Sequence, residues 1–179
     1  LLALDRQYLD RIVVHGHAEL AFSHGLAGWH GPVPPDSPKL AGRVSFSSHS
    51  FNELNNCAPC PSAFIGPVFD SHSKIGYHAA MDVQSWRHGV KGWKSAPNRQ
   101  VEQLYALGGV DVERLPSVVD MGFDGAAVLG AVWNTFDPLT AWDDLHLERQ
   151  RVIGLVPQKM PPIASWREEL QKRRVGEGI

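Results

Sequence analysis

The feature that most constrains this chain is a regular alternation of short apolar runs with amphipathic stretches. Helical periodicity appears at 18–24, 51–55, 112–121 and 131–145. The runs with the length and content of buried strands are 11–14, 27–30, 43–47, 63–68, 103–108 and 125–129. Strands that alternate with helices pair in parallel through right-handed crossovers, so the sequence predicts an α/β fold.

The alternation fits an open α/β sheet or a (β/α)8 TIM barrel, and as a barrel the chain would be incomplete. Such a barrel needs eight strands and typically about 200 residues or more, whereas this chain of 179 residues offers six. We expect strands three to eight of the barrel in 1–150, with the two N-terminal βα units lacking, and a C-terminal extension or tail in 151–179. Further βα units or self-association as a homo-oligomer would cover the two open edges.

Composition points to a small-molecule partner. The 17 Lys and Arg residues nearly balance 19 Asp and Glu residues, for a net charge of −2, which disfavours nucleic acid and anionic membranes as partners. No run approaches the roughly 18 to 20 apolar residues of a membrane span, and no leader opens the chain. We therefore expect a cytoplasmic protein.

Two sets of side chains resemble metal or redox sites. Cys57 and Cys60 have the spacing of a redox dithiol or half a zinc site, but flanking prolines favour two reduced thiols in a loop. His15, His17 and His30 fall at strand ends, where no carboxylate accompanies them at ligand spacing. We favour a site without a metal or other cofactor.

The segment 66–74 carries the strongest anion signal. It follows a predicted strand and places Ser71, Ser73 and Lys74 within four positions. Hydroxyls and loop N–H groups can face phosphate oxygens while the ammonium group supplies charge. A serine-rich turn without a ligand is the alternative.

Small residues follow the last two predicted strands. Gly108 and Gly109 end one of them, and Leu129-Gly130 leads from the other into a helix. Glycine lets a backbone approach a ligand closely, and a helix start offers free N–H groups. The alternative is that these residues only make tight turns.

His49 follows the strand 43–47 between two serines. A histidine at this edge could move a proton near neutral pH, which makes it the candidate catalytic residue. A capping or surface role is the alternative.

Four segments in order resemble the thiamin phosphate synthase and TenI family of barrels. Residues 44–53 are similar to its Val-Ser-x-His-Ser/Thr-x-x-Glu stretch, and 64–74 to its Gly-Pro-x-Tyr/Phe-x-Thr-x-Thr-Lys phosphate loop. Residues 106–110 resemble its Ile-Gly-Gly-Ile/Val turn, and 122–129 its last strand. The likeness extends over about 11–137.

The resemblance implies a role for each matching residue. It implies that the ligand is a small phosphorylated thiazole or pyrimidine. His49 matches the proton-transfer histidine of TenI-type thiazole tautomerases, and Ser47 matches a serine on the diphosphate and pyrimidine side. The implied phosphate contacts are Ser71, Ser73, Lys74, Gly108, Gly109, Leu129 and Gly130.

The chain departs from the family at the magnesium ligands. A synthase couples hydroxymethylpyrimidine diphosphate to thiazole phosphate, and the family holds Mg²⁺ for this with two aspartates. Those positions read Gly16 and Pro35 here, with Asp36 as an unaligned neighbour. Magnesium prefers oxygen ligands, so this loss should weaken a metal site.

Three functions follow from these expectations. The favoured one is metal-independent tautomerisation of a thiazole phosphate by His49. The alternative is a thiamin phosphate synthase, which would use Mg²⁺. The third is a non-catalytic barrel that binds a thiamin precursor.

Overall fold

Six parallel strands form one sheet in the computed structural model, which describes residues 5–32, 43–70, 76 and 78–154. The sheet order β1-β2-β3-β4-β5-β6 is the chain order. The strands are β1 (Val13–His15), β2 (Gly28–His30), β3 (Arg43–Ser48), β4 (Cys60–Ile65), β5 (Val101–Leu107) and β6 (Gly125–Ala127). The predicted parallel α/β arrangement with six strands is confirmed.

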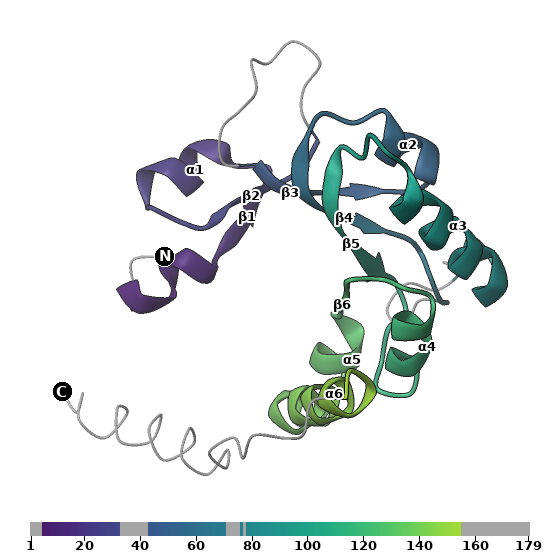
Figure 1. The fold of residues 1–179 in the computed structure, drawn as a ribbon. Helices are drawn as coiled ribbons and strands as arrows, with labels where there is room; N and C mark the ends of the chain where they lie inside the picture. Colours follow the sequence, from purple (N-terminus) through teal and green to yellow (C-terminus); the bar gives the residue numbers. More distant parts are fainter. Residues whose placement is uncertain (1–4, 33–42, 71–75, 77, 155–179) are drawn as a thin grey trace.

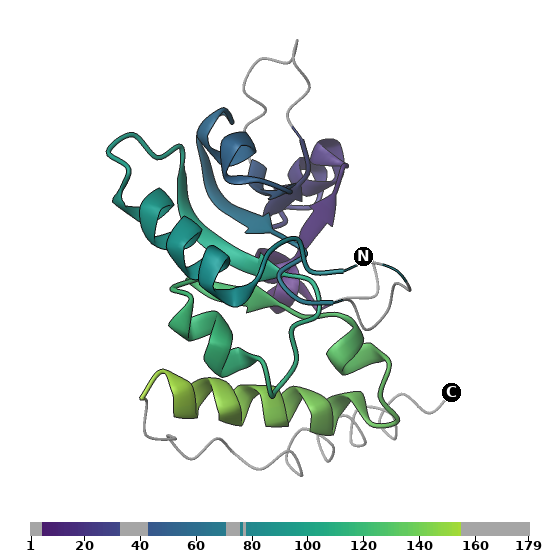
Figure 2. The ribbon, with the colours of Figure 1, turned by 90° about the vertical axis from the view of Figure 1, so that its right-hand side faces the viewer.

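The sheet curls into part of a barrel wall (Figure 1). Its two edges, β1 and β6, do not meet, and α6 crosses the end of the sheet that β6 forms (Figure 2). A curled parallel sheet of this kind agrees with part of a TIM-like barrel. The two N-terminal βα units expected from the sequence remain a prediction.

Helices connect the strands in the expected α/β rhythm, with two differences from the sequence prediction. The helix α3 was not predicted, and the expected helix at 131–145 is two helices. Asp137 caps the second of these by accepting from the Leu139 and Thr140 amides, and Pro138 at its first position can only begin a helix. The helices are η1 (Arg6–Arg11), α1 (Ala18–Ser23), α2 (Phe51–Asn55), α3 (Val83–Ser95), α4 (Leu115–Asp120), α5 (Gly130–Trp133) and α6 (Pro138–Val152).

The main core lies between one face of the sheet and the helices α2, α3 and α4. On this face Ala63, Ile65 and Leu104 are fully buried. Trp86 and Val90 of α3 pack in the same apolar cluster and are also fully buried. Alternate residues of each strand point to the opposite, inner face.

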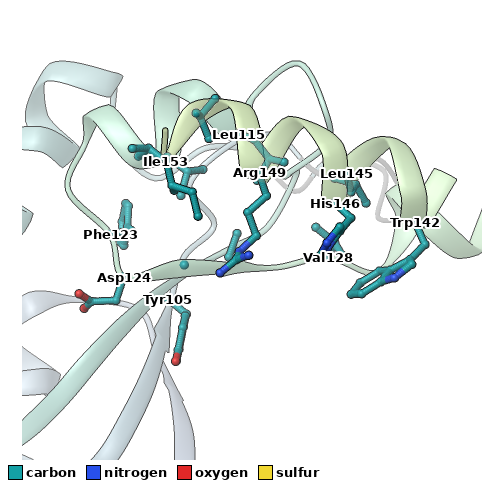
Figure 3. Close-up of a pocket in the computed structure, with 15 residues that line it drawn as sticks. Tyr105, Leu115, Phe123, Asp124, Val128, Trp142, Leu145, His146, Arg149 and Ile153 are labelled. Atoms are coloured by element: carbon teal, nitrogen blue, oxygen red, sulfur yellow. The ribbon is translucent and has the colours of Figure 1, made fainter. Parts of the chain in front are cut away.

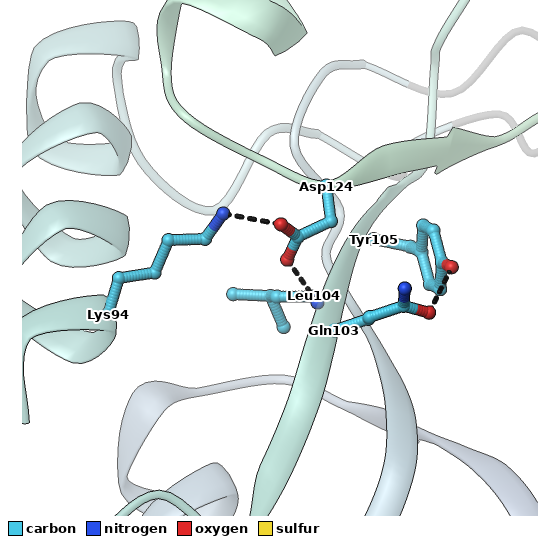
Figure 4. Close-up of polar contacts among 5 residues, drawn as sticks. All are labelled: Lys94, Gln103, Leu104, Tyr105 and Asp124. Carbon is cyan, nitrogen blue, oxygen red and sulfur yellow. Dashed lines mark hydrogen bonds and ion pairs between the residues drawn. The ribbon is translucent and has the colours of Figure 1, made fainter. Parts of the chain in front are cut away.

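Asp124 ties α3 to the last two strands (Figure 4). One carboxylate oxygen lies 2.6 Å from Nζ of Lys94, and the other accepts from the backbone amide of Leu104 at 2.8 Å. The loop before β6 is thereby fixed against β5, which sets the register of the strand that ends in the predicted cradle.

Within the described residues, no helix is both long and apolar enough to cross a bilayer.

Candidate functional site

A row of aromatic rings crosses the inner face of the sheet. His15 and His30 have ring centroids 5.2 Å apart, and His30 lies 5.5 Å from Phe64. Phe64 in turn stacks on Tyr105 at 5.5 Å. Parallel pairing aligns these positions, since His15 is opposite His30, and Phe64 is opposite Tyr105. The row offers a platform on which a flat heterocycle can stack.

His30 is the best-anchored member of this row. Its Nδ1 lies 2.8 Å from the hydroxyl of Ser45, and its Nε2 lies 3.1 Å from the hydroxyl of Ser47. Burial, and then the nearby charge of His15, lower the pKa of His30. The ring is therefore neutral at pH 7, and the exposed Ser47 hydroxyl is held at the mouth of the sheet.

His49 lies at the same edge, as predicted. Its Nδ1 is 3.2 Å from the carbonyl oxygen of Gly66 at the end of the next strand. Its backbone amide donates to Glu53 at 2.8 Å, and this hydrogen bond is the main cause that lowers the pKa of Glu53. His49 is exposed, so a ligand could reach its ring, and its catalytic role stays a prediction.

The turns after β4 and β5 lock together through their backbones. The amide of Val68 donates to Leu107 at 2.9 Å, and that of Phe69 donates to Gly108 at 3.2 Å. Gly109 has φ +63°, and a Cβ there would come within 2.2 Å of the carbonyl oxygen of Asp70. Only glycine permits this approach, which brings the two predicted glycines beside the start of the predicted phosphate loop.

Arg114 contacts both of these turns. Its Nη1 donates to the carbonyl oxygen of Gly109 at 2.6 Å, and its guanidinium lies 5.3 Å from the ring centre of Phe69. Asp70 accepts from the amide of Ala79 at 2.7 Å, which lowers the pKa of its carboxyl group. The described residues Asp70 and Ala79, which flank the segment 71–78, are thus held together. The predicted phosphate contacts Ser71, Ser73 and Lys74 lie outside the described residues.

The second half of the predicted cradle lies where β6 leads into α5. Leu129 is the N-cap of that helix and is 66% exposed, and Gly130 is its first residue. Their contact with phosphate stays a prediction.

An apolar hollow of about 420 Å³ surrounds the free edge of β6 (Figure 3). Tyr105 and Gly125 contribute to it from the sheet, and Trp142, His146 and Arg149 from α6. None of the described residues predicted for the site lines this hollow, His49 included.

The sequence interpretation missed the inner-face platform as a unit. It considered His30 only as a metal-ligand candidate and did not consider Ser45, Phe64 or Tyr105. The available signal was the spacing of two between inner-face positions of one strand, but only the strand register brings them together. Among the described residues, no three His, Cys, Asp or Glu side chains form a group able to hold a metal ion. Cys57 and Cys60 are not joined in a disulfide.

Comparison with curated proteins finds thiamine-phosphate synthases. The chain is 26% identical over 140 residues to that of Serratia proteamaculans and 25% identical over 147 residues to that of Agrobacterium fabrum. These matches cover 73% and 75% of this chain. The chain spans only 63% and 64% of the length of these two relatives. No family model matches the chain.

Solved structures agree with these relatives. The thiamine phosphate pyrophosphorylase of Bacteroides thetaiotaomicron matches with a TM-score of 0.62 and 28% identity, over 81% of this chain and 73% of that one. The thiamine phosphate pyrophosphorylase of Pyrococcus furiosus matches with a TM-score of 0.59 over 85% of this chain and 81% of that one; at 18% identity it supports the fold alone. Together with the ordered motifs, these findings support the resemblance of the chain to the thiamin phosphate synthase and TenI family.

Proposed function

We propose that this chain carries the substrate-binding wall of a thiamin phosphate synthase. In that reaction a C–N bond forms between the thiazole nitrogen and the pyrimidine methylene carbon. The C–O bond to diphosphate breaks, and its electron pair leaves with the diphosphate. The names of the curated relatives support this function over tautomerisation, which no comparison supports specifically.

The row of rings on the inner face is the observation that carries the proposal. It gives a heteroaromatic substrate a stacking surface on β4 and β5, the two strands whose following turns are locked together. Phe64 is the central ring, because it contacts both His30 and Tyr105. The pyrimidine would stack here, while the phosphate groups extend to the turns above.

The donors at the ends of β1 and β2 do not suit a magnesium ion. Magnesium takes oxygen ligands in octahedral geometry. The positions that the family gives to aspartate are Gly16 and Pro35, and the described donors nearby are imidazole nitrogens of His15 and His30. Asp36 lies outside the described residues. The proposed step is therefore not routed through a metal.

Tautomerisation by His49 is the second candidate. It is favoured by the exposed ring of His49 at the mouth of the sheet and by the loss of both family carboxylates. Proton transfer between two carbon atoms of a thiazole phosphate needs no leaving group and so no metal.

The test incubates the 179-residue chain with hydroxymethylpyrimidine diphosphate and thiazole phosphate and follows products by mass spectrometry. Phe64→Leu should reduce thiamin phosphate formation about tenfold or more, since it removes the stacking ring. Phe136→Leu is the matched control, because Phe136 is fully exposed. Equal rates in both variants would contradict the role of the ring row.

A parallel incubation with the thiazole phosphate carboxylate tautomer separates the two candidates. Isomerisation that His49→Gln abolishes, without any thiamin phosphate formation, would replace the synthase proposal by the tautomerase. If neither product forms, the remaining candidate is a barrel that binds a thiamin precursor without converting it.

A further inference from the structure

The proposed stacking of the substrate on Phe64 gives no role to the imidazole ring of His15. Its ring lies 5.2 Å from that of His30, with the two planes tilted by 49°. Both ring nitrogens of His30 already contact serine hydroxyls. His15 is exposed, and its ring makes no hydrogen bond to any other described residue. It is therefore the member of the pair that can bind a ligand.

The surroundings of this pair favour an anion. Burial, and then the nearby charge of His15, lower the pKa of His30, which disfavours a positive charge on the half-buried ring of the pair. His17 and Glu19 lie next along the chain, at the start of α1. They face each other, with Nδ1 and Oε1 3.3 Å apart. Among the described contacts of His30, β3 contributes the hydroxyls of Ser45 and Ser47, and β4 contributes the ring of Phe64.

The missing carboxylates change which ligands can bind beside His15 and His30. Two aspartates repel a diphosphate unless a divalent cation lies between them. Glycine and proline at those positions remove both carboxylates of the family's metal site, and with them the repulsion that a divalent cation would offset. A protonated imidazole and a hydroxyl can then donate to phosphate oxygens directly.

We propose that His15 binds a phosphate oxygen of the diphosphate as an imidazolium group, in place of the magnesium ion of the family. The exposed hydroxyl of Ser47 is its partner on the far side of His30, and His30 is a positioning residue that holds this hydroxyl. The inference rests on the proposed function only for the identity of the anion.

The direct test is calorimetric titration of the chain with inorganic pyrophosphate in the presence of EDTA between pH 6 and pH 8. His15→Gln should bind about tenfold more weakly at pH 6, because glutamine keeps hydrogen bonding but not the charge. His24→Gln is the matched control, since His24 is an exposed histidine at the other end of α1. The affinity for pyrophosphate should increase from pH 8 to pH 6 by a larger factor in the wild type than in His15→Gln. Protonation of pyrophosphate itself affects both proteins equally, so it does not contribute to this difference.

A second readout guards against misfolding. In spectra of histidine-labelled protein, pyrophosphate should shift the ring signals of His15 in the wild type, with melting temperatures of all variants compared beforehand. His15→Asn replaces His15→Gln if the latter unfolds. Equal affinity of wild type and His15→Gln would overturn the inference. So would binding that needs Mg²⁺ and disappears in Asp36→Asn.

The two proposals fail separately. If wild type and His15→Gln form thiamin phosphate at the same rate, the synthase proposal stands and the proposed anion site at His15 is rejected. If pyrophosphate binding depends on His15 but no thiamin phosphate forms, the anion site stands and the synthase proposal is rejected.

Discussion

Gly66 offers the sharpest test of the locked turns at the mouth of the sheet. A Cβ at this position would lie 1.9 Å from the carbonyl oxygen of Leu107. That oxygen is backbone and accepts from the amide of Val68 at 2.9 Å, so the two turns must separate to admit a methyl group. Overpacking costs about 1–3 kcal/mol, and the loss of a hydrogen bond adds about 0.5–1.5 kcal/mol. We expect Gly66→Ala to lower the free energy of unfolding by about 2–4 kcal/mol.

Gly92 provides the same substitution without the obstacle. It lies in α3, and a Cβ there meets nothing within 4 Å. Gly92→Ala should therefore raise the free energy of unfolding by about 0.5–1 kcal/mol. Urea unfolding followed by circular dichroism measures both changes in the free energy of unfolding. The melting temperature of Gly66→Ala should fall by roughly 4–16 °C, at about 2–4 °C per kcal/mol. Equal stability of the two variants would refute the reasoning about the turns.

Three further predictions concern named side chains. The lowered pKa of Glu53 means that its stabilisation is present above the unfolded pKa and is lost as pH falls through the folded value; Glu53→Gln should melt lower than the wild type at pH 7, and this difference should shrink as the pH falls through the folded pKa. Trp86→Ala should lower the free energy of unfolding by about 3–5 kcal/mol, whereas Trp133→Ala, at a site 70% exposed, should change it by less than about 0.5 kcal/mol. Chemical denaturation measures both changes. Asp124→Ala leaves a backbone amide of β5 unpaired and should cost about 1–3 kcal/mol, but Lys94→Met removes only a partly exposed ion pair and should cost under about 1 kcal/mol; similar losses would contradict this assignment.

The sheet was predictable because each strand is a short apolar run between turn residues. The helix α3 was not predicted, although Trp86, Val90 and Trp93 are spaced as one buried helical face. Two glycines in this helix lower its local propensity. Gly89 is needed there because a Cβ would meet the Phe51 ring at 2.3 Å, a contact that only the folded structure reveals.

The candidate site was predictable only where local sequence decides it. His49 follows its strand directly, and its position at the mouth was expected. The contact of His30 with two serines depends on a register shift between β2 and β3, which local patterns do not encode. The roles of Ser71, Ser73 and Lys74 remain predictions from the motif.

The order of the sheet has a consequence for how the molecule comes apart. Every strand pairs with its neighbours in sequence, so segments can separate from one end without unthreading the rest. The main apolar cluster draws on β3, β4 and β5, whereas buried Trp29 and Ala21 of the β1-α1-β2 unit lie outside it. Amide hydrogens of β1 and β2 should therefore exchange faster than those of β4 and β5. The histidine pair would then sit on the first part of the molecule to open, and an anion bound there would slow that opening.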